Sequence, residues 1–207
     1  MIDSKTKLCC IIGNPVHHSL SPKMHNAAYK ELKLNYVYLA FSPDNLKNAL
    51  DGLLTIGTRG ISVTVPFKEE VLKDVHQKDG PVISLGAANT LVNNNGDWYA
   101  YNTDWIGAVN ALKEVTNLKG TSVVILGSGG AARAVSYGLK QSGAKVYIVA
   151  RNRKKGKKLV SDLSLNGYNY QNDDLMRKCE ILVNATPLGM HPFESKSPVS
   201  NTVFNRK

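Results

Sequence analysis

Hydrophobic residues in this chain form short runs that alternate with longer stretches in which apolar residues recur every three or four positions. The short runs are typical of buried strands, and the longer stretches are typical of amphipathic helices. In the first half they predict strands at 7–12, 36–41, 60–65, 90–93 and 98–101, and helices after Pro22, around 43–54 and after Pro66. Strands that alternate with helices indicate an α/β fold with a largely parallel sheet.

The second half repeats this alternation with fewer strands. It predicts strands at 121–127, 145–150 and 180–184, and helices at 105–115, 131–141, 153–164 and 172–178. We expect two domains, residues 1–104 and 105–207, with a cleft between them. The second domain would hold three strands, or four with one more short strand, whereas a complete dinucleotide-binding domain has about six.

A glycine-rich turn joins the strand at 121–127 to the helix at 131–141. Its sequence, GSGGAAR, fits the G-x-G-x-x-G/A pattern of dinucleotide-binding βαβ units at Gly127, Gly129 and Ala132. In such a turn the first glycine permits a tight bend, the second lets backbone amides approach a pyrophosphate, and the small third residue keeps the helix close to the strand. A purely structural turn is the alternative, but the flanking strands and helix favour nucleotide binding.

The residues after the next strand distinguish between nucleotides. An NAD-binding unit carries Asp or Glu there, which holds the ribose 2′-hydroxyl. This chain has ARNRKK at 150–155 instead. Guanidinium and ammonium groups would bind a 2′-phosphate that a carboxylate would repel, so the pattern predicts NADP(H) and a reductive step. The alternative is a solvated, basic start of a helix.

The length of 207 residues and the hydrophobic content of 43% suffice for one large domain or for two of about 100 residues. No apolar run reaches the ~18 residues of a membrane span, and the polar start does not resemble a signal peptide. We therefore expect a soluble, cytoplasmic protein without membrane partners. Cys9, Cys10 and Cys179 are odd in number and form no CxxC pair, which argues against a disulfide framework or a zinc site.

The formal charge of +10 raises the question of nucleic-acid binding. Outside 151–158 the lysines are scattered, and no helix-turn-helix, finger or RNA-binding signature accompanies them. A basic surface also suits anionic small molecules, so we expect a small-molecule substrate and no nucleic-acid partner. His17, His18 and His25 lack a carboxylate or cysteine at a compatible spacing, so we expect no metal site.

Small polar residues gather in four segments beside predicted strand ends, where open α/β sheets place their ligands. The segments are GNPVHHSLSPKMHN at 13–26, SVTVPFK at 62–68, GAANT at 86–90 and YNTDW at 101–105. They offer neutral hydrogen-bonding groups, one cation and one anion, namely Ser19, Ser21, Thr64, Asn89, Thr103, Lys68 and Asp104. Such a set suits a polyhydroxylated acid. Lys68 could relay a proton to a reacting carbinol with Asp104 as its partner, or the two could be unrelated solvated charges.

These segments are followed in order by GSGGAAR, ARNRKKGKK and NATPLGM, the last at 184–190. Together they resemble the shikimate dehydrogenase family from about Cys9 to Pro192. The resemblance implies an N-terminal substrate-binding α/β domain and a Rossmann-type NADP-binding domain. It also implies NADPH-dependent, reversible reduction of 3-dehydroshikimate to shikimate in the biosynthesis of aromatic amino acids. We expect a monomer or a homodimer.

The resemblance further implies roles for individual residues. Ser19, Ser21, Thr64, Asn89 and Asp104 would hold the carboxylate and hydroxyls of shikimate, with Thr103 beside them. Lys68 would donate or accept the proton, with Asp104 as its partner. The cofactor would lie against Gly127, Ser128, Gly129, Gly130, Ala131 and Ala132 at its pyrophosphate, against Ala150, Arg151, Asn152 and Lys155 at its 2′-phosphate, and near Thr186 and Met190 at its nicotinamide end.

The chain departs from the family pattern in two ways. GAANT stands where the family has GAVNT, and the family pattern continues past residue 207 with further strands and helices. An inactive or non-catalytic fragment that binds NADPH or shikimate therefore stays an alternative, as does a dehydrogenase that also uses quinate. Tyr29 and Lys33 have the Y-x-x-x-K spacing of another ketoreductase class, but they precede the nucleotide site.

Overall fold

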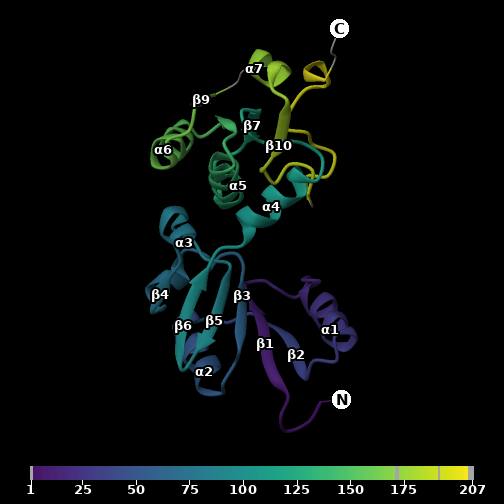
Figure 1. Ribbon diagram of the computed structural model, residues 1–207, viewed down its shortest axis with the longest axis vertical. Coiled ribbons are helices and arrows are strands. Elements are labelled where there is room, and N and C mark those ends of the chain that lie inside the picture. Colours follow the sequence, from purple (N-terminus) through teal and green to yellow (C-terminus); the bar gives the residue numbers. More distant parts are fainter. Residues whose placement is uncertain (1, 171–172, 191, 205–207) are drawn as a thin grey trace. The chain divides into compact units, whose positions relative to one another are not determined.

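The computed structural model describes residues 2–170, 173–190 and 192–204, and it divides into two compact units, Met1–Thr103 and Asp104–Lys207 (Figure 1). Each unit combines one sheet with several helices, which confirms the predicted α/β class. Within the described residues, no helix is long and apolar enough to cross a lipid bilayer.

The first unit is built on a six-stranded sheet in the order β2-β1-β3-β5-β6-β4. Its strands are β1 (Lys7–Ile12), β2 (Tyr36–Phe41), β3 (Gly60–Val63), β4 (Gln77–Lys78), β5 (Thr90–Asn94) and β6 (Asp97–Tyr101). β1 is parallel to both β2 and β3, as expected, but β5 is antiparallel to both β3 and β6. The sheet is therefore mixed.

A two-residue turn between β5 and β6 explains this reversal. Asn95 and Gly96 both have a positive φ, at 55° and 93°, and the flanking Asn94 and Asp97 pair with each other. Asn-Gly is favoured at such a turn because both residues tolerate the left-handed region and the turn matches the twist of the strands. The short apolar runs on either side thus form a hairpin rather than two strands of a parallel sheet.

Helices cover both faces of this sheet. They are α1 (Ser21–Glu31), α2 (Leu46–Thr55), the 3₁₀ helix η1 (Glu70–Lys73) and α3 (Gly80–Leu85). Cys10 and Ile12 of β1 belong to the core formed with α2, η1 and α3, whereas the alternate residue Ile11 packs with Tyr38 and the α1 residue Tyr29. The two faces of one strand therefore contribute to two separate cores, as the period of two along a strand requires.

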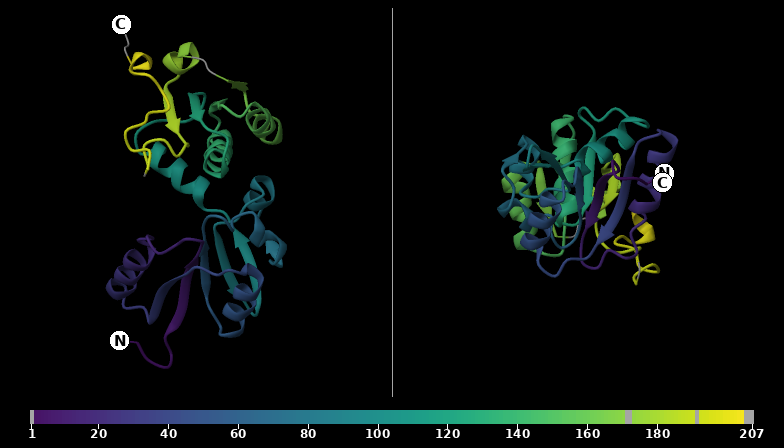
Figure 2. Two further views of the ribbon diagram at one scale, coloured as in Figure 1. Left: turned by 180° about the vertical axis from the view of Figure 1, so that it is seen from behind. Right: turned by 90° about the horizontal axis from the view of Figure 1, so that it is seen from below.

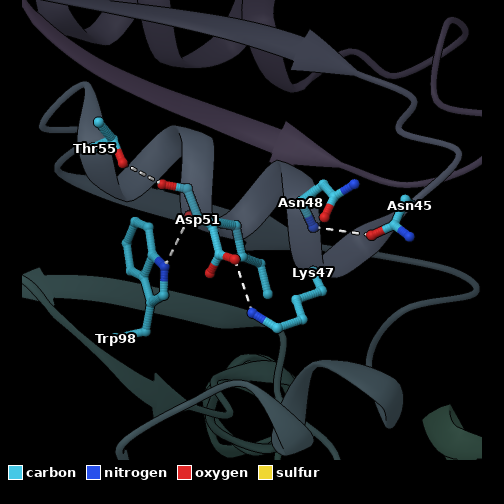
Figure 3. Close-up of polar contacts among 7 residues, drawn as sticks. Asn45, Lys47, Asn48, Asp51, Thr55 and Trp98 are labelled. Carbon is cyan, nitrogen blue, oxygen red and sulfur yellow. Dashed lines mark hydrogen bonds and ion pairs between the residues drawn. The ribbon is translucent and has the colours of Figure 1, made fainter.

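Polar contacts fix the start of α2 and hold this helix against its neighbours (Figure 3). The side-chain oxygen of Asn45 accepts a hydrogen bond from the backbone N–H of Asn48 at 2.9 Å, which caps the helix. Leu50 faces the core, and its carbonyl accepts a hydrogen bond from the indole nitrogen of Trp98 at 3.3 Å. This bond satisfies the polar atom of a large buried side chain and fixes α2 against β6.

The sequence predicted only a loop where β4 and α3 lie. β4 has two residues and α3 has six, so neither is long enough to show a periodic pattern. The local signals of α3 were nevertheless present. The carboxylate of Asp79 accepts a hydrogen bond from the backbone N–H of Val82 at 2.7 Å, and Pro81 occupies the first turn.

The second unit contains a four-stranded parallel sheet in the order β10-β7-β8-β9, seen from behind in the left view of Figure 2. Its strands are β7 (Ser122–Leu126), β8 (Lys145–Val149), β9 (Gly167–Asn169) and β10 (Ile181–Asn184). Its helices are α4 (Asp104–Lys113), α5 (Gly130–Gln141), α6 (Arg153–Leu163), α7 (Asp173–Lys178) and the 3₁₀ helix η2 (Asn201–Val203). The sequence predicted three strands in this unit, with a short fourth strand as an option, and β9 is that fourth strand.

The two faces of this sheet also have separate cores. Val123 and Ile125 of β7 pack with residues of α4, α5 and α6, whereas the alternate residues Val124 and Leu126 pack with residues of α7 and η2. A parallel strand covered on both faces reads as a continuous apolar run, which is the pattern of residues 123–126. This arrangement leaves the carboxyl ends of the strands for a ligand.

Candidate functional site

The polar segments of the first unit meet along one edge of its sheet. Backbone hydrogen bonds join Thr64 N to the Ile12 carbonyl at 2.9 Å, Val63 N to the Asn89 carbonyl at 2.8 Å, and Asn89 N to the Tyr101 carbonyl at 3.1 Å. Because β5 is antiparallel, its amino end lies beside the carboxyl ends of β3 and β6. The structure therefore brings Thr64 and Asn89 to the edge that follows β1, together with the residues after Tyr101.

Asn89 and Thr103 are held to each other at this edge. The Asn89 side-chain oxygen accepts hydrogen bonds from the Thr103 backbone N–H at 2.9 Å and from the Thr90 hydroxyl at 3.0 Å. The Asn89 amide nitrogen donates to the Thr103 hydroxyl at 3.0 Å. Groups fixed in this way are oriented before any ligand arrives, which lowers the entropy lost on binding.

Thr64 and Lys68 lie on the loop that follows β3. A Cβ atom added to Gly13 would lie 2.4 Å from Cγ2 of Thr64, so only glycine allows the loop after β1 to approach this closely. The backbone N–H of Asn14 then donates to the Val65 carbonyl at 3.1 Å. The carbonyl of Lys68 accepts a hydrogen bond from Ala88 N at 2.8 Å, which ties the backbone of Lys68 to the loop that carries Asn89.

Ser19 and Ser21 lie where the loop after β1 enters α1. The Ser19 hydroxyl accepts a hydrogen bond from the Ser21 backbone N–H at 3.2 Å, and Ser19 N donates to the Val16 carbonyl at 3.0 Å. Val16 N in turn donates to the hydroxyl of Ser42 at 3.2 Å, after β2. Both serines therefore belong to a loop that hydrogen bonds anchor at the carboxyl ends of β1 and β2.

Tyr38 lies in the core beneath α1. Burial raises the pKa of the Tyr38 phenol to about 12, although its hydrogen bond to the Ser62 hydroxyl, at 2.6 Å, acts in the opposite direction. His25 stacks on the Tyr38 ring with 4.2 Å between the ring centres.

Among the residues that the structure describes, no three His, Cys, Asp or Glu side chains form a group that could hold a metal ion.

Asp104 is the first residue of α4 and opens the second unit, whereas Lys68 belongs to the first. An acidic residue at this position interacts favourably with the amino end of the helix dipole. The pairing of Lys68 with Asp104 stays a prediction.

The glycine turn of the second unit adopts the geometry that its sequence predicts. Gly127 has a φ of +115°, and a Cβ atom there would lie 2.9 Å from the carbonyl oxygen of Ala185, after β10. Gly129 is the N-cap of α5, and within the described chain no side chain makes a capping hydrogen bond there. Ala132 is completely buried against the sheet. Because no described side chain caps α5, its first amides are suited to an anion.

A cavity of about 1220 Å³ lies at the carboxyl ends of β7, β8 and β10. Its lining includes seven of the residues that the sequence assigned to the cofactor, namely Gly127, Ser128, Gly129, Ala150, Arg151, Asn152 and Thr186. The other assigned residues that the structure describes lie outside the lining, namely Gly130, Ala131, Ala132, Lys155 and Met190. The cavity is therefore lined by the glycine turn, by the first residues of the basic cluster at 151–158 and by the turn after β10.

Two of these residues are held by local hydrogen bonds. Asn152 caps α6, because its side-chain oxygen accepts a hydrogen bond from the Lys155 backbone N–H at 2.9 Å. Thr186 is fixed in a tight turn, where both its backbone N–H and its hydroxyl donate to the side-chain oxygen of Asn184, at 2.9 and 2.7 Å. Residues 185–188 of the NATPLGM segment therefore form a hydrogen-bonded turn that lines the cavity.

Further residues line the cavity without having been predicted, among them Tyr170, Asp173, Leu188, Phe193, Lys196 and Val199. Tyr170 follows β9, whose three residues are too few to show alternation. The available signal was Gly167 at the start of this strand, together with the aromatic residues Tyr168 and Tyr170. Leu188, Phe193, Lys196 and Val199 lie outside helices and strands, where hydrophobic periodicity carries no information.

Each of the two units matches a known family model. Residues 11–91 match the family model described as shikimate dehydrogenase substrate binding domain. Residues 122–197 match the one described as NADP oxidoreductase coenzyme F420-dependent. The curated shikimate dehydrogenase (NADP(+)) of Methanothermobacter thermautotrophicus is 40% identical over 210 residues, which cover 96% of this chain and 74% of that protein.

Solved structures agree with these matches. A crystal structure of shikimate dehydrogenase in complex with NADP+ has a TM-score of 0.91 and 38% identity, and the match covers 97% of this chain and 73% of that chain. The enzyme from Thermus thermophilus, in complex with NADP(H) and shikimate, has a TM-score of 0.87 and 32% identity, with 96% and 75% covered.

Proposed function

Because the chain belongs to the shikimate dehydrogenase family, we propose that it catalyses the reversible, NADPH-dependent reduction of 3-dehydroshikimate to shikimate. The observation that carries this proposal is the edge of the first sheet, where Thr64, Lys68 and Asn89 lie on loops joined by backbone hydrogen bonds. This edge offers fixed hydroxyl and amide groups to a polyhydroxylated acid.

We propose that the substrate's carboxylate and hydroxyls bind to Ser19, Ser21, Thr64, Asn89, Thr103 and Asp104. The hydrogen bonds between Asn89 and Thr103 support this assignment, because they orient an amide and a hydroxyl without any charged group. The anchored loop of Ser19 and Ser21 adds two further hydroxyls. A site built to hydrogen-bond substrate hydroxyls discriminates strongly against analogues that lack them.

We propose that the ammonium of Lys68 gives its proton to the C3 oxygen as the ketone is reduced, and takes a proton back in the reverse reaction. Asp104 would hold this ammonium in position. The backbone of Lys68 is fixed by the hydrogen bond from Ala88, so its side chain starts from a defined point beside Asn89. Positioning of this kind lowers the entropic part of the barrier.

The second unit fits the adenosine and pyrophosphate parts of NADP(H). Open amides at the start of α5 suit a pyrophosphate, and the absence of a Cβ at Gly127 permits the tight approach of the Ala185 backbone. We propose that Gly127–Ala131 hold the pyrophosphate and that Arg151, Asn152 and Lys155 surround the 2′-phosphate. Thr186 and Met190 would lie at the nicotinamide end. NADPH, when bound, supplies the hydride.

We further infer a cytoplasmic enzyme of aromatic amino-acid biosynthesis that acts as a monomer or a homodimer. Sedimentation of the purified chain distinguishes the two oligomeric states.

The direct test is oxidation of shikimate and of quinate by this polypeptide, each with NADP+ and with NAD+. We expect the highest kcat/KM for shikimate with NADP+. Comparable turnover of quinate would make the enzyme a dehydrogenase for both acids. Binding of NADP+ without oxidation of either acid would overturn the catalytic proposal and leave a nucleotide-binding protein.

A further inference from the structure

Tyr170 lies at the same edge of the second sheet as the basic cluster. In the parallel register of β8 and β9, Val149 pairs with Asn169, so the residues that follow each strand come side by side. Ala150 N donates to the Asn169 carbonyl at 3.2 Å, and the Tyr168 hydroxyl donates to the Ala150 carbonyl at 2.9 Å. Tyr170 therefore begins its loop next to Ala150, and it lines the same cavity as Arg151 and Asn152.

The ring of Tyr170 also contacts Arg153, a cation of the basic cluster to which the family resemblance gives no role of its own. The guanidinium carbon of Arg153 lies 4.7 Å from the centre of this ring. Arg153 is the first residue of α6, directly after the cap Asn152. An arginine stacked on an aromatic ring keeps the donors in the plane of its guanidinium available for a further hydrogen bond.

The start of α6 is fixed independently of this contact. A Cβ atom on Gly156 would lie 2.3 Å from Cε2 of Tyr168, so only glycine lets the first turn of α6 pack this closely on β9. Asn152 caps the same turn with a hydrogen bond of 2.9 Å. The backbone that carries Arg153 is therefore held on the strand that leads into Tyr170.

We propose that Tyr170 is a positioning residue for cofactor selection, whose ring holds the Arg153 guanidinium where it binds the 2′-phosphate of NADP(H). The inference rests on the proposed cofactor and adds a specificity determinant to it. NAD(H) carries a hydroxyl in place of this phosphate, so it gains little from a positioned guanidinium. Loss of the ring should weaken the binding of NADP(H) and leave that of NAD(H) unchanged.

The test compares Tyr170→Leu with Tyr170→Phe in the full chain. Calorimetry gives Kd for NADP+, NAD+, adenosine 2′,5′-bisphosphate and AMP, and circular dichroism checks that each variant is folded. A cation–π contact at an exposed site corresponds to a change of about two- to fivefold in Kd. We expect this rise for NADP+ and for the bisphosphate with Tyr170→Leu only, because Tyr170→Phe keeps the ring.

A double-mutant cycle identifies the cation on which Tyr170 acts. In an Arg153→Ala background, Tyr170→Leu should cause no further loss of NADP+ affinity. If the double variant loses NADP+ affinity by the product of the two single-variant factors, the two residues act independently and the proposal is overturned. Lys145→Ala is the charge control, because Lys145 begins β8 and so lies at the opposite, amino end of the strand. It should leave the affinity for both nucleotides unchanged.

The outcomes separate this inference from the proposed function. A wild-type chain that binds NAD+ as tightly as NADP+ would overturn the cofactor assignment and the role of Tyr170 together. A wild-type preference for NADP+ that survives Tyr170→Leu would overturn only the role of Tyr170. Equal loss for NADP+ and NAD+ would also overturn it, since the ring would then shape the adenosine site rather than select the phosphate.

Discussion

The side chain of Asn89 binds both the backbone and the hydroxyl of Thr103, at 2.9 and 3.0 Å. The two residues are 14 positions apart in the sequence and lie together at the open end of one hairpin, opposite its turn. This pair orients an amide and a hydroxyl at the proposed substrate site, and it also holds together the ends of β5 and β6. Substitutions here should therefore change substrate binding through geometry as well as through direct contact.

Asn89→Ala should raise KM for shikimate roughly tenfold or more, because it removes one proposed contact and leaves the Thr103 amide without its partner. Steady-state kinetics with shikimate and NADP+ measure the effect. Asn94→Ala is the matched control at the far end of β5, and it should leave KM unchanged. A KM within about twofold of wild type for Asn89→Ala would remove Asn89 from the substrate site.

Lys68→Ala should lower kcat by about 10²- to 10⁴-fold with only a modest change in KM for shikimate, because general acid catalysis acts on the transition state. Lys73→Ala, on the exposed side of η1, is the control for loss of one positive charge. Near-normal turnover by Lys68→Ala would exclude Lys68 as the proton donor.

Gly127→Ala should lower the free energy of unfolding by about 1–3 kcal/mol, because φ at this position is +115° and the added Cβ would lie 2.9 Å from the Ala185 carbonyl. Urea denaturation measures the loss. Gly129→Ala provides the contrast, since its φ is −87° and a Cβ there meets open space among the described residues. This variant should fold normally and bind NADP+ more weakly. Wild-type NADP+ affinity would contradict the assignment of the pyrophosphate to this turn.

Asp162→Asn should destabilise the second unit at neutral pH more than in acid. Hydrogen bonds from Lys158 and Arg133, at 2.9 and 2.8 Å, lower the pKa of the Asp162 carboxyl below its ordinary value of 3.8. A lowered folded-state pKa contributes stability above the unfolded-state pKa, and this contribution is lost as the pH falls through the folded-state pKa.

Thermal unfolding of wild type and Asp162→Asn as a function of pH measures this difference. The gap in Tm between them should narrow as the pH falls below 3.8. Asp51→Asn, which removes one carboxylate from an exposed pair with Lys47 on α2, is the control for the loss of one negative charge. A gap that stays constant across this range would show that the charge of Asp162 does not contribute.

Periodicity located the elements that bury a continuous apolar run or face. The predicted limits of β1 and β2 coincide with the observed ones, because six residues suffice to show a buried strand. α3 and β4 were not predicted, and β9 was anticipated only as an optional fourth strand without bounds, since strands of two or three residues and a helix of six show no period. The apolar pattern did not distinguish the antiparallel hairpin from two parallel strands, although the Asn95–Gly96 pair was a direct local signal for a hairpin.

In the proposed nucleotide site, too, some residues could be predicted from the sequence and others could not. The glycine turn and the residues after β8 were predictable because each has a fixed place relative to a strand end. Tyr170 and Phe193 line the cavity from irregular segments, so their positions depend on contacts that only the folded chain defines. The residues alone left Lys68 and Asp104 as either a proton-relay pair or two unrelated charges, because two charges in a sequence do not show that they meet. The family resemblance favoured the first of these interpretations.

The Asn95–Gly96 turn makes the pairing of Asn89 with Thr103 a local event in folding. Hairpins close within microseconds, far sooner than contacts between distant segments of a chain, so this part of the proposed substrate site depends only on local contacts. The same turn sets the register of both strands. A slip of this register by one residue would displace Asn89 from Thr103 without altering any residue proposed to touch the substrate.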